Sequence, residues 1–340
     1  MIAGSRRSPS PDVTVIIPTR DRRERLATAL ASALAQGDVN IEVLVIDDGS
    51  RDGTSAMVEG FGDVRVRVLR NDVPLGESGA RNRGLAAARG AWIAFLDDDD
   101  LWAPEKLSAQ VRAMHETDRE WAYAGDVVVD DELRVLYGAP PPPPHVVVAS
   151  LTRHNSVPAS ASNVIAGADL LARAGPFDPG LRRTADWDMW LRLARIGPPA
   201  YVPRPLVAIR VHPGSMSRDM AAMFRELDVL AQRYGIPVDR ARHCRWAAWE
   251  AMQAGRRAEA LGYYARAVMA GDLRSIGRAA VAVLRPRSSD VRSETDAWTS
   301  EARPWVAGVS ASQRVLSPVM ETAGPRRPSG IAGDPRQPFP

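Results

Sequence analysis

The hydrophobic residues of the first hundred positions follow two kinds of pattern. Mainly apolar runs, typical of buried strands, occupy residues 13–17, 41–46 and 91–96, and residues 64–69 predict a further strand. Between the first two runs, residues 22–36 place Leu26, Leu30 and Ala33 at helical spacing, and residues 78–89 predict a second helix. Strands that alternate with helices predict an α/β fold with a mostly parallel sheet sandwiched by helices.

Less regular patterns follow the first hundred residues. They predict strands at 121–129 and 135–137, an amphipathic helix at 186–196 and an extended segment at 202–211. Five consecutive prolines, residues 140–144, predict a stiff exposed loop. From about residue 216 the pattern becomes helical, and residues 254–273 resemble one hairpin of a tetratricopeptide array. A single hairpin has no neighbouring repeat to bury its faces, which favours a helical lid or brace.

These changes of pattern divide the chain into four parts. Residues 1–11 are expected to form a flexible N-terminus, residues 12–220 an α/β domain and residues 221–284 a small helical region. From residue 285 onward the sequence turns to Pro, Ser, Arg and Gly with scattered apolar residues. Residues 285–340 are therefore expected to be a disordered tail.

Composition and charge narrow the class of protein. Hydrophobic residues make up 45% and charged residues 25%, which is ordinary for a globular protein. The net charge is only +3 and the basic residues form no single block with aromatic partners, which argues against nucleic-acid binding. A single cysteine, Cys244, excludes an intramolecular disulfide and fits a reducing compartment, so we expect a cytoplasmic protein.

The sequence also indicates how the protein could relate to a membrane. The N-terminus lacks the apolar stretch of a signal peptide, and no apolar run is long enough to span a bilayer. Peripheral contact of the protein with the inner face of the membrane is compatible with the sequence.

Ligands of parallel sheets bind beyond the carboxyl ends of the strands. Polar residues that follow a strand are therefore the strongest candidates for functional residues. Asp97, Asp98, Asp99 and Asp100 follow the fourth predicted strand. Adjacent carboxylates there repel one another unless a cation is present, and their oxygens suit Mg²⁺ or Mn²⁺. In an extended segment Asp97 and Asp99 would point to one side and Asp98 to the other. The alternative is a helix N-cap ahead of residues 101–110, a role that suits Asp100.

Two further segments carry weaker signals. Asp47 and Asp48 end the second predicted strand, where a carboxylate could accept a hydrogen bond from a pyrimidine ring, although a turn explains the pair equally well. Residues 71–90 place glycines and Arg81 at the start of a helix, which suits a diphosphate. These glycines do not fit a Rossmann loop, which should follow the first strand.

Five blocks between residues 13 and 217 carry a resemblance to a known family. They read VTVIIPTRDR, IEVLVIDDGSRDGT, LGESGARNRGLAAARGAWIAFLDDDD, ADWDMWLRL and IRVHPGSMS. In this order and spacing they resemble the inverting family 2 glycosyltransferases with the GT-A fold. The resemblance implies a hexosyltransferase-type enzyme that moves a sugar from a nucleoside-diphosphate sugar, with a UDP-sugar favoured, to an acceptor hydroxyl in cell-surface glycan or glycoconjugate biosynthesis. It also implies a divalent metal, Mn²⁺ or Mg²⁺.

The resemblance implies a role for individual residues. The nucleotide sugar would be bound by Pro18, Thr19, Arg20, Asp48, Arg81, Asp97 and Asp98. Within this set Asp48 would hold the base, and Arg81 would contact the diphosphate or have a structural role. Asp99 would be the main metal ligand, with Asp97 and His212 as further ligands. For a lone histidine such as His212, a structural role is the alternative.

Asp186 corresponds to the aspartate that acts as catalytic base in the family, at the start of a helix that favours its ionised form. Ala185 stands where the family usually has a glutamate, a departure that bears on acceptor recognition and activity. Asp188 could partly substitute for this glutamate.

Two other functions compete with the transferase interpretation. One is a catalytically silent member that binds a nucleotide sugar, or a partner through its C-terminal helices. The other is a nucleotidyltransferase, which needs a glycine-rich loop with Arg and Lys after the first strand. The segment IIPTRDR lacks these features.

Overall fold

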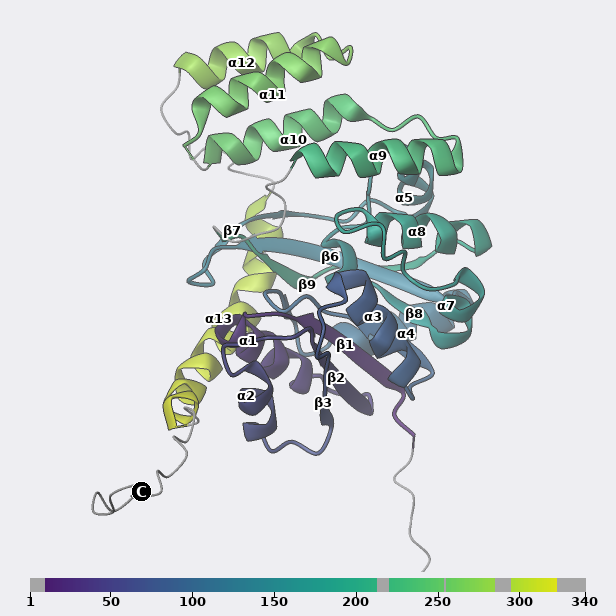
Figure 1. The fold of residues 1–340 in the computed structure, drawn as a ribbon, viewed down its shortest axis with the longest axis vertical. Helices are drawn as coiled ribbons and strands as arrows, with labels where there is room; N and C mark the ends of the chain where they lie inside the picture. The colour runs from purple at the N-terminus through teal and green to yellow at the C-terminus, as the bar shows by residue number, and fades with distance from the viewer. Residues whose placement is uncertain (1–9, 213–219, 254, 285–294, 323–340) are drawn as a thin grey trace, which may run out of the picture.

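The computed structural model describes residues 10–212, 220–253, 255–284 and 295–322, and its centre is a nine-stranded sheet (Figure 1). The strands follow the order β3-β2-β1-β4-β8-β6-β9-β5, with β7 paired to β6. The N-terminal half consists of β1 (Val13–Thr19), β2 (Ile41–Asp47), β3 (Val66–Arg70) and β4 (Trp92–Phe95), which pair in parallel. The β-branched runs of β1 and β2 are fully buried because helices cover both faces.

The C-terminal half of the sheet is mixed. It consists of β5 (Leu101–Trp102), β6 (Trp121–Val129), β7 (Val135–Ala139), β8 (Ile165–Gly167) and β9 (Ala200–Arg210). β6 and β9 are parallel, whereas β8 is antiparallel to both β4 and β6. The α/β fold is therefore confirmed, with its uniformly parallel part confined to the first four strands.

Two apolar cores lie on opposite faces of the sheet. One face is covered by α1 (Arg23–Leu34), α2 (Thr54–Gly60) and α4 (Lys106–Thr117). The other is covered by α3 (Gly76–Ala87), α5 (Pro144–Leu151), α6 (Ser160–Asn163), α7 (Ala168–Ala174) and α8 (Ala185–Ile196). Parallel strands joined by helices on both faces leave the strand ends as the place where loops converge.

Two local expectations are wrong. The helix expected at residues 101–110 begins only at Lys106, because Leu101 and Trp102 pair with β9 as a short antiparallel strand. The five prolines are not a wholly exposed loop. Pro141 is buried, Tyr123 donates a hydrogen bond of 2.5 Å to the carbonyl of Pro142, and Pro144 begins α5, where its missing N–H costs nothing.

The C-terminal helices begin with α9 (Met220–Tyr234), which buries Leu227 and Leu230 in the same core as α8. Above it, α10 (Arg240–Gln253), α11 (Arg257–Met269) and α12 (Arg274–Leu284) stack at one end of the molecule (Figure 1). Their small shared core is formed by alanines of α10 and by Tyr263 and Tyr264 of α11. Among the described residues no helix has the length and apolarity needed to cross a bilayer.

The expectation of disorder from residue 285 is wrong for residues 295–322, which form α13 (Thr295–Thr322). Trp298 packs against the sheet and donates a hydrogen bond of 2.9 Å to the carbonyl of Asp126. Gly138 makes room for it, since a Cβ atom there would lie 2.9 Å from the indole. A few large side chains at helical spacing are enough to order a segment whose average composition suggests disorder. Residues 1–9 of the expected flexible N-terminus, and 285–294 and 323–340 of the expected tail, lie outside the described residues.

Trp298→Ala tests whether α13 is part of the stable fold. We expect the free energy of unfolding to fall by about 3 kcal/mol, because the substitution removes a buried indole and leaves a cavity beside Gly138. Urea unfolding measures the change, with the solvent-exposed Val64→Ala as a control that shifts stability by less than about 0.5 kcal/mol. Equal stability of the two variants would show that α13 does not contribute to the core.

Candidate active site

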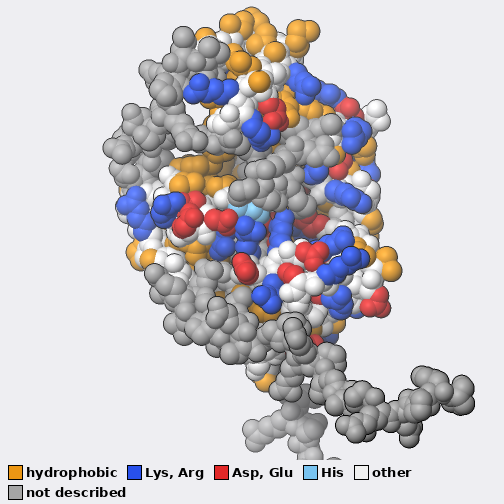
Figure 2. Space-filling view, turned by 60° about the vertical axis from the view of Figure 1, so that its left-hand side comes forward, with side chains coloured by type: hydrophobic (Ala, Val, Ile, Leu, Met, Phe, Trp, Pro, Cys, Tyr) orange, Lys and Arg blue, Asp and Glu red, His pale blue; other side chains and the backbone are white. Residues whose placement is uncertain are grey.

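The carboxyl ends of β1, β2 and β4 meet at one edge of the sheet. Thr19 ends β1 and pairs in register with Asp47, which ends β2, and Asp48 follows. The acidic tetrad, Asp97 to Asp100, follows β4 on the other side of β1. Acidic and basic side chains are intermingled across the middle of one face of the molecule (Figure 2).

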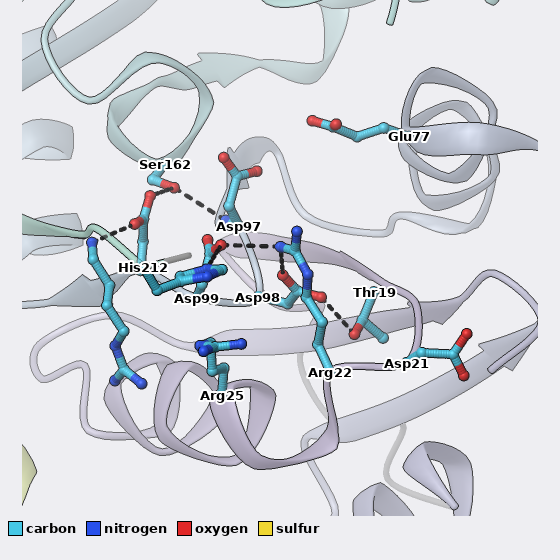
Figure 3. A network of polar contacts seen from close by, with 12 residues as sticks. Thr19, Asp21, Arg22, Arg25, Glu77, Asp97, Asp98, Asp99, Ser162 and His212 are labelled. Carbon is cyan, nitrogen blue, oxygen red and sulfur yellow. Dashed lines mark hydrogen bonds and ion pairs between the residues drawn. The ribbon is translucent and has the colours of Figure 1, made fainter. Parts of the chain in front are cut away.

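The acidic tetrad forms a turn and not an extended strand. The backbone N–H of Asp100 donates to the carbonyl of Asp97 at 3.2 Å. Figure 3 shows Asp98 and Asp99 converging on Arg22, while Asp97 points away. The predicted alternation of side chains is therefore wrong, because it holds only where the backbone stays extended.

Arg22, from the loop between β1 and α1, lies between two carboxylates of the acidic tetrad. Its Nη1 donates to Asp98 Oδ1 at 2.8 Å and to Asp99 Oδ2 at 2.9 Å. Burial, with the charge of Asp99, raises the pKa of Asp98 to about 6, although Arg22 and a hydrogen bond of 2.7 Å from the Thr19 hydroxyl oppose the rise. The protein itself thus supplies part of the positive charge that the sequence analysis assigned to a metal.

Asp99 is also the partner of His212. The Nε2 atom of His212 lies 3.0 Å from Asp99 Oδ2, and the imidazole is fully buried. Burial favours a higher pKa for Asp99, but the hydrogen bond with His212 and the charge of Arg22 lower it below its usual value. Asp99 is therefore ionised, and it lies directly against a ring nitrogen from a segment more than a hundred residues away.

Asp100 fixes the turn. Its oxygens accept hydrogen bonds from the hydroxyl of Ser162 at 2.5 Å and from the backbone N–H of Arg210 at 3.1 Å. Burial raises the pKa of Asp100 well above its usual value. The N-cap alternative is wrong, since α4 does not begin until Lys106.

Asp97 belongs to a second group of charges. Arg81, buried in α3, donates to Asp97 Oδ1 at 2.7 Å and also pairs with Glu77 one turn earlier. Burial raises the pKa of Glu77 to about 7, against the opposing charge of Arg81. Of the two roles left open for Arg81, its contacts fit the structural one.

Asp186 lies in the first turn of α8 and adjoins this second group. Asn155 donates to its Oδ2 at 3.2 Å, and the backbone N–H of Trp187 donates to its Oδ1 at 2.7 Å. Burial raises its pKa to about 6 and Asp97 adds to the rise, whereas the charge of Arg81 opposes it. Burial therefore outweighs the helix N-terminus, which was expected to favour the ionised form. Ala185 is buried in the apolar core and brings no polar group to the site.

Asp48 is buried at the N-terminal end of α3. Its Oδ1 accepts from Asn71 at 2.7 Å and from the N–H of Leu75 at 2.8 Å, and its Oδ2 accepts from the N–H of Gly76 at 2.8 Å. Asp47 is fully buried and binds Arg70 at 2.6 Å. Both carboxylates thus shape the turn, and Asp48 retains room for one further donor at most.

The remaining predicted residues lie at the end of β1. Pro18 is buried within the strand, whereas Arg20 is exposed and lies 3.8 Å from Asp21. Thr19, through its bond to Asp98, connects the two strand ends. The structure therefore brings Thr19, Asp98, Asp99 and His212 into one hydrogen-bonded group, and places Arg20 outside it.

A cavity of about 490 Å³ lies beside this group. It is lined by Asp21, Arg22, Arg23, Glu24, Arg25, Asp52, Asp131 and Arg210. The side chain of Arg210 is buried, and its Nε and Nη2 atoms have no hydrogen-bond partner within the described part of the chain. Burial lowers the pKa of Arg210, which nevertheless stays cationic at neutral pH. The cavity is therefore lined by a buried cation whose charge interacts with Asp131, Asp99 and Asp100.

The donor set at Asp99 and His212 fits a divalent ion. A carboxylate oxygen and an imidazole nitrogen are ligands that Mn²⁺ accepts, and such ions commonly keep positions for phosphate oxygens. Across the described ranges, no three His, Cys, Asp or Glu residues gather into a metal-binding group. An ion here would thus rest on two protein ligands, with Asp97 turned toward Arg81 instead.

Helix α9 holds the start of α8 in place. The carboxylate of Glu226 accepts from the backbone N–H groups of Arg183 at 2.8 Å and Thr184 at 3.0 Å. Asp188 is buried and bound by Arg192, Arg233 and Tyr234, the last at 2.6 Å. The carboxylate of Asp188 therefore attaches α9 to α8 through its hydrogen bonds. Because it is engaged in this way, it does not replace the glutamate that is absent at Ala185.

Sequence reasoning missed several residues of the site. Arg22 ends the quoted TRDR block, so its three charged residues in four positions were an available signal. Glu77 lies within the quoted block that begins at Leu75, whereas Ser162, Asn155 and Glu226 come from segments with no local motif. Only the fold brings them to the strand ends.

Glu226→Ala tests this anchoring. We expect a loss of about 2 kcal/mol in the free energy of unfolding, because backbone N–H groups at the start of α8 lose a charged acceptor. Thermal and urea unfolding measure it, with the exposed Glu59→Ala of α2 as the control. A Glu226→Ala protein as stable as the control would contradict the assignment.

Comparisons with known proteins point to a family for part of the chain. Residues 14–154 match the glycosyl transferase family 2 model. The succinoglycan biosynthesis protein ExoO of Rhizobium meliloti is 45% identical over 101 residues, which cover 30% of this chain and 29% of ExoO. WfgD of Escherichia coli, a UDP-Glc:alpha-D-GlcNAc-diphosphoundecaprenol beta-1,3-glucosyltransferase, is 35% identical over 35% of this chain and 47% of its own length. The chain therefore spans less than half of these two relatives.

Two further likenesses extend over more of the chain. WfaP of Escherichia coli, which carries the same enzyme name as WfgD, is 29% identical over 63% of this chain and 82% of its own length. The crystal structure of residues 1–349 of Staphylococcus aureus TarS in complex with UDP covers 90% of this chain and 91% of that one, with a TM-score of 0.52 and 16% identity. The match over residues 14–154 identifies this part of the chain as a family 2 glycosyltransferase domain, and the likeness to TarS shows that the shared GT-A fold extends over most of the chain.

Proposed function

We propose that the chain is a metal-dependent, inverting glycosyltransferase that moves a sugar from a nucleoside-diphosphate sugar to an acceptor hydroxyl. The observation that carries this proposal is the position of Asp186, close enough to Arg81 and Asp97 for their charges to act on its pKa. This position supports Asp186 as the candidate base beside the acidic tetrad. The names of WfgD and WfaP support a UDP-sugar donor, a saccharide acceptor on a lipid diphosphate and a role in cell-surface glycan biosynthesis.

Asp186 would act as the general base. With a pKa of about 6 it is mostly ionised at neutral pH, yet basic enough to take a proton from an acceptor hydroxyl. The acceptor oxygen would attack the anomeric carbon while the bond from that carbon to the diphosphate oxygen breaks. The leaving nucleoside diphosphate keeps the electron pair, and a single displacement inverts the configuration.

The donor would lie along the strand ends. Thr19 and Asp98 would border the ribose, and Asp48 has one place left for a base N–H. Asp99 and His212 would hold the divalent ion, which when bound neutralises charge on the departing diphosphate. Arg22 and Arg210 would add positive charge from the cavity side.

A catalytically silent nucleotide-sugar-binding protein is the second candidate. Two observations favour it. Ala185 brings no carboxylate to the site, and Arg22 pairs with both Asp98 and Asp99 without a metal. Turnover of any nucleotide sugar that depends on added Mn²⁺ or Mg²⁺ decides between the two functions.

Separate Asp186→Asn and Asp99→Ala variants test the assigned roles. Asp186→Asn removes the base, so we expect transfer to slow by a factor of about 10² to 10⁴ while donor binding changes little. Asp99→Ala removes a metal ligand, so we expect the stimulation by Mn²⁺ to disappear. Transfer and donor hydrolysis are measured together, with and without a chelator.

Asp169→Asn is the matched control, because Asp169 is an exposed aspartate in the first turn of α7. It should transfer sugar at the rate of the unmodified chain. Full activity of both Asp186→Asn and Asp99→Ala would reject the assignments.

A further inference from the structure

The end of the molecule formed by α11 and α12 presents apolar side chains to solvent. Met269, at the end of α11, is 88% exposed, Leu273, just before α12, is 70% exposed, and Ile276 in the first turn of α12 is 58% exposed. The inner face of α12 is formed by the buried Ser275 and by Ala279, which packs against α10 and α11. The exposed apolar residues are therefore not required by the fold.

Positive charge surrounds these apolar residues. Arg274 and Arg278 are exposed one turn apart on α12, and Arg278 lies 3.6 Å from Asp272. Residues 240–284 contain eight arginines against three acidic residues, a net charge of +5, whereas the whole chain carries +3. The net positive charge of this helical end therefore exceeds the net charge of the whole chain.

We propose that this end of the molecule, the α12 surface (Met269, Leu273, Arg274, Ile276 and Arg278), binds an anionic phospholipid bilayer. An apolar group flanked by arginines suits a membrane interface, where the apolar side chains insert and the cations meet lipid phosphates. The α12 surface forms the end of the molecule above the face with mixed charges (Figure 2).

A second copy of the chain fits this surface less well. Three apolar side chains fall far short of the area of about 800 Å² per partner that stable interfaces bury. Two copies would also bring Arg274 and Arg278 against the same residues of the other copy, and like charges repel. Anionic lipid is the occupant that uses both the apolar and the cationic side chains.

This inference deepens the proposed function, since an acceptor on a lipid diphosphate lies in a membrane, but its evidence is independent of catalysis. Flotation of the full chain with vesicles tests it without donor or acceptor. Binding is compared between phosphatidylcholine vesicles and vesicles that also contain phosphatidylglycerol, at low and high salt. We expect binding to the anionic vesicles that weakens with salt.

Two double variants separate the contributions of the arginines and of the apolar side chains to vesicle binding. Arg274→Gln with Arg278→Gln should weaken binding to anionic vesicles about 25-fold, since each arginine near such a surface contributes about fivefold. Leu273→Gln with Ile276→Gln should weaken it by a similar factor by removing inserted apolar groups. Arg134→Gln and Val64→Gln, at exposed positions elsewhere, are the matched controls.

Several outcomes would overturn the inference. These are no binding to either vesicle, equal binding by controls and double variants, or a concentration-dependent dimer that only the α12 variants lose. Loss of vesicle binding with transfer to a soluble acceptor intact would support the α12 surface while leaving catalysis unaffected. Absence of any transfer with vesicle binding intact would instead contradict the proposed function.

Discussion

Ion pairing of three carboxylates of the acidic tetrad with two internal arginines is the interaction on which the site depends. Four carboxylates follow β4 within one turn, and they lie close together because Arg22 binds Asp98 and Asp99 while Arg81 binds Asp97. Arg22 comes from the loop after β1 and Arg81 from α3, so the tetrad also ties the strand ends to both flanking elements. An ion that binds Asp99 must share this carboxylate with Arg22 or displace it. Ligand binding is thereby coupled to the position of the loop that follows β1.

The second constraint is the attachment of α8 to the helices that follow the sheet. Asp186 lies in the first turn of α8, and the position of that turn depends on Glu226 of α9 as well as on the core around Trp187. Asp188, two residues on, receives hydrogen bonds from Arg233 and Tyr234 at the far end of α9. The helical region thus begins with an element that positions the candidate base. The division of the chain near residue 220 remains a prediction.

Much of the fold and part of the site could be predicted from the sequence, for identifiable physical reasons. The first two strands are runs rich in β-branched residues, and polar residues at or beyond the strand ends, such as Thr19 and Asp99, must lie at one edge of a parallel sheet. The amino-acid composition gave a wrong prediction of disorder at α13, where Trp298 fills space left by glycines of distant strands. Arg22, Ser162 and Glu226 act through contacts across 40 to more than 75 residues, which no local pattern encodes. The charge argument for a metal was incomplete for the same reason, since the arginines that supply part of the positive charge are distant in sequence.

The central claim is that the strand ends bind a nucleoside diphosphate together with a divalent ion held by Asp99 and His212. Thermal unfolding of the unmodified chain with UDP, with Mn²⁺ and with both tests it most directly, because a ligand bound only by the folded state raises the melting temperature. The account predicts that UDP and Mn²⁺ together stabilise the chain more than the sum of their separate effects. A melting temperature that UDP leaves unchanged, with or without Mn²⁺, would contradict it.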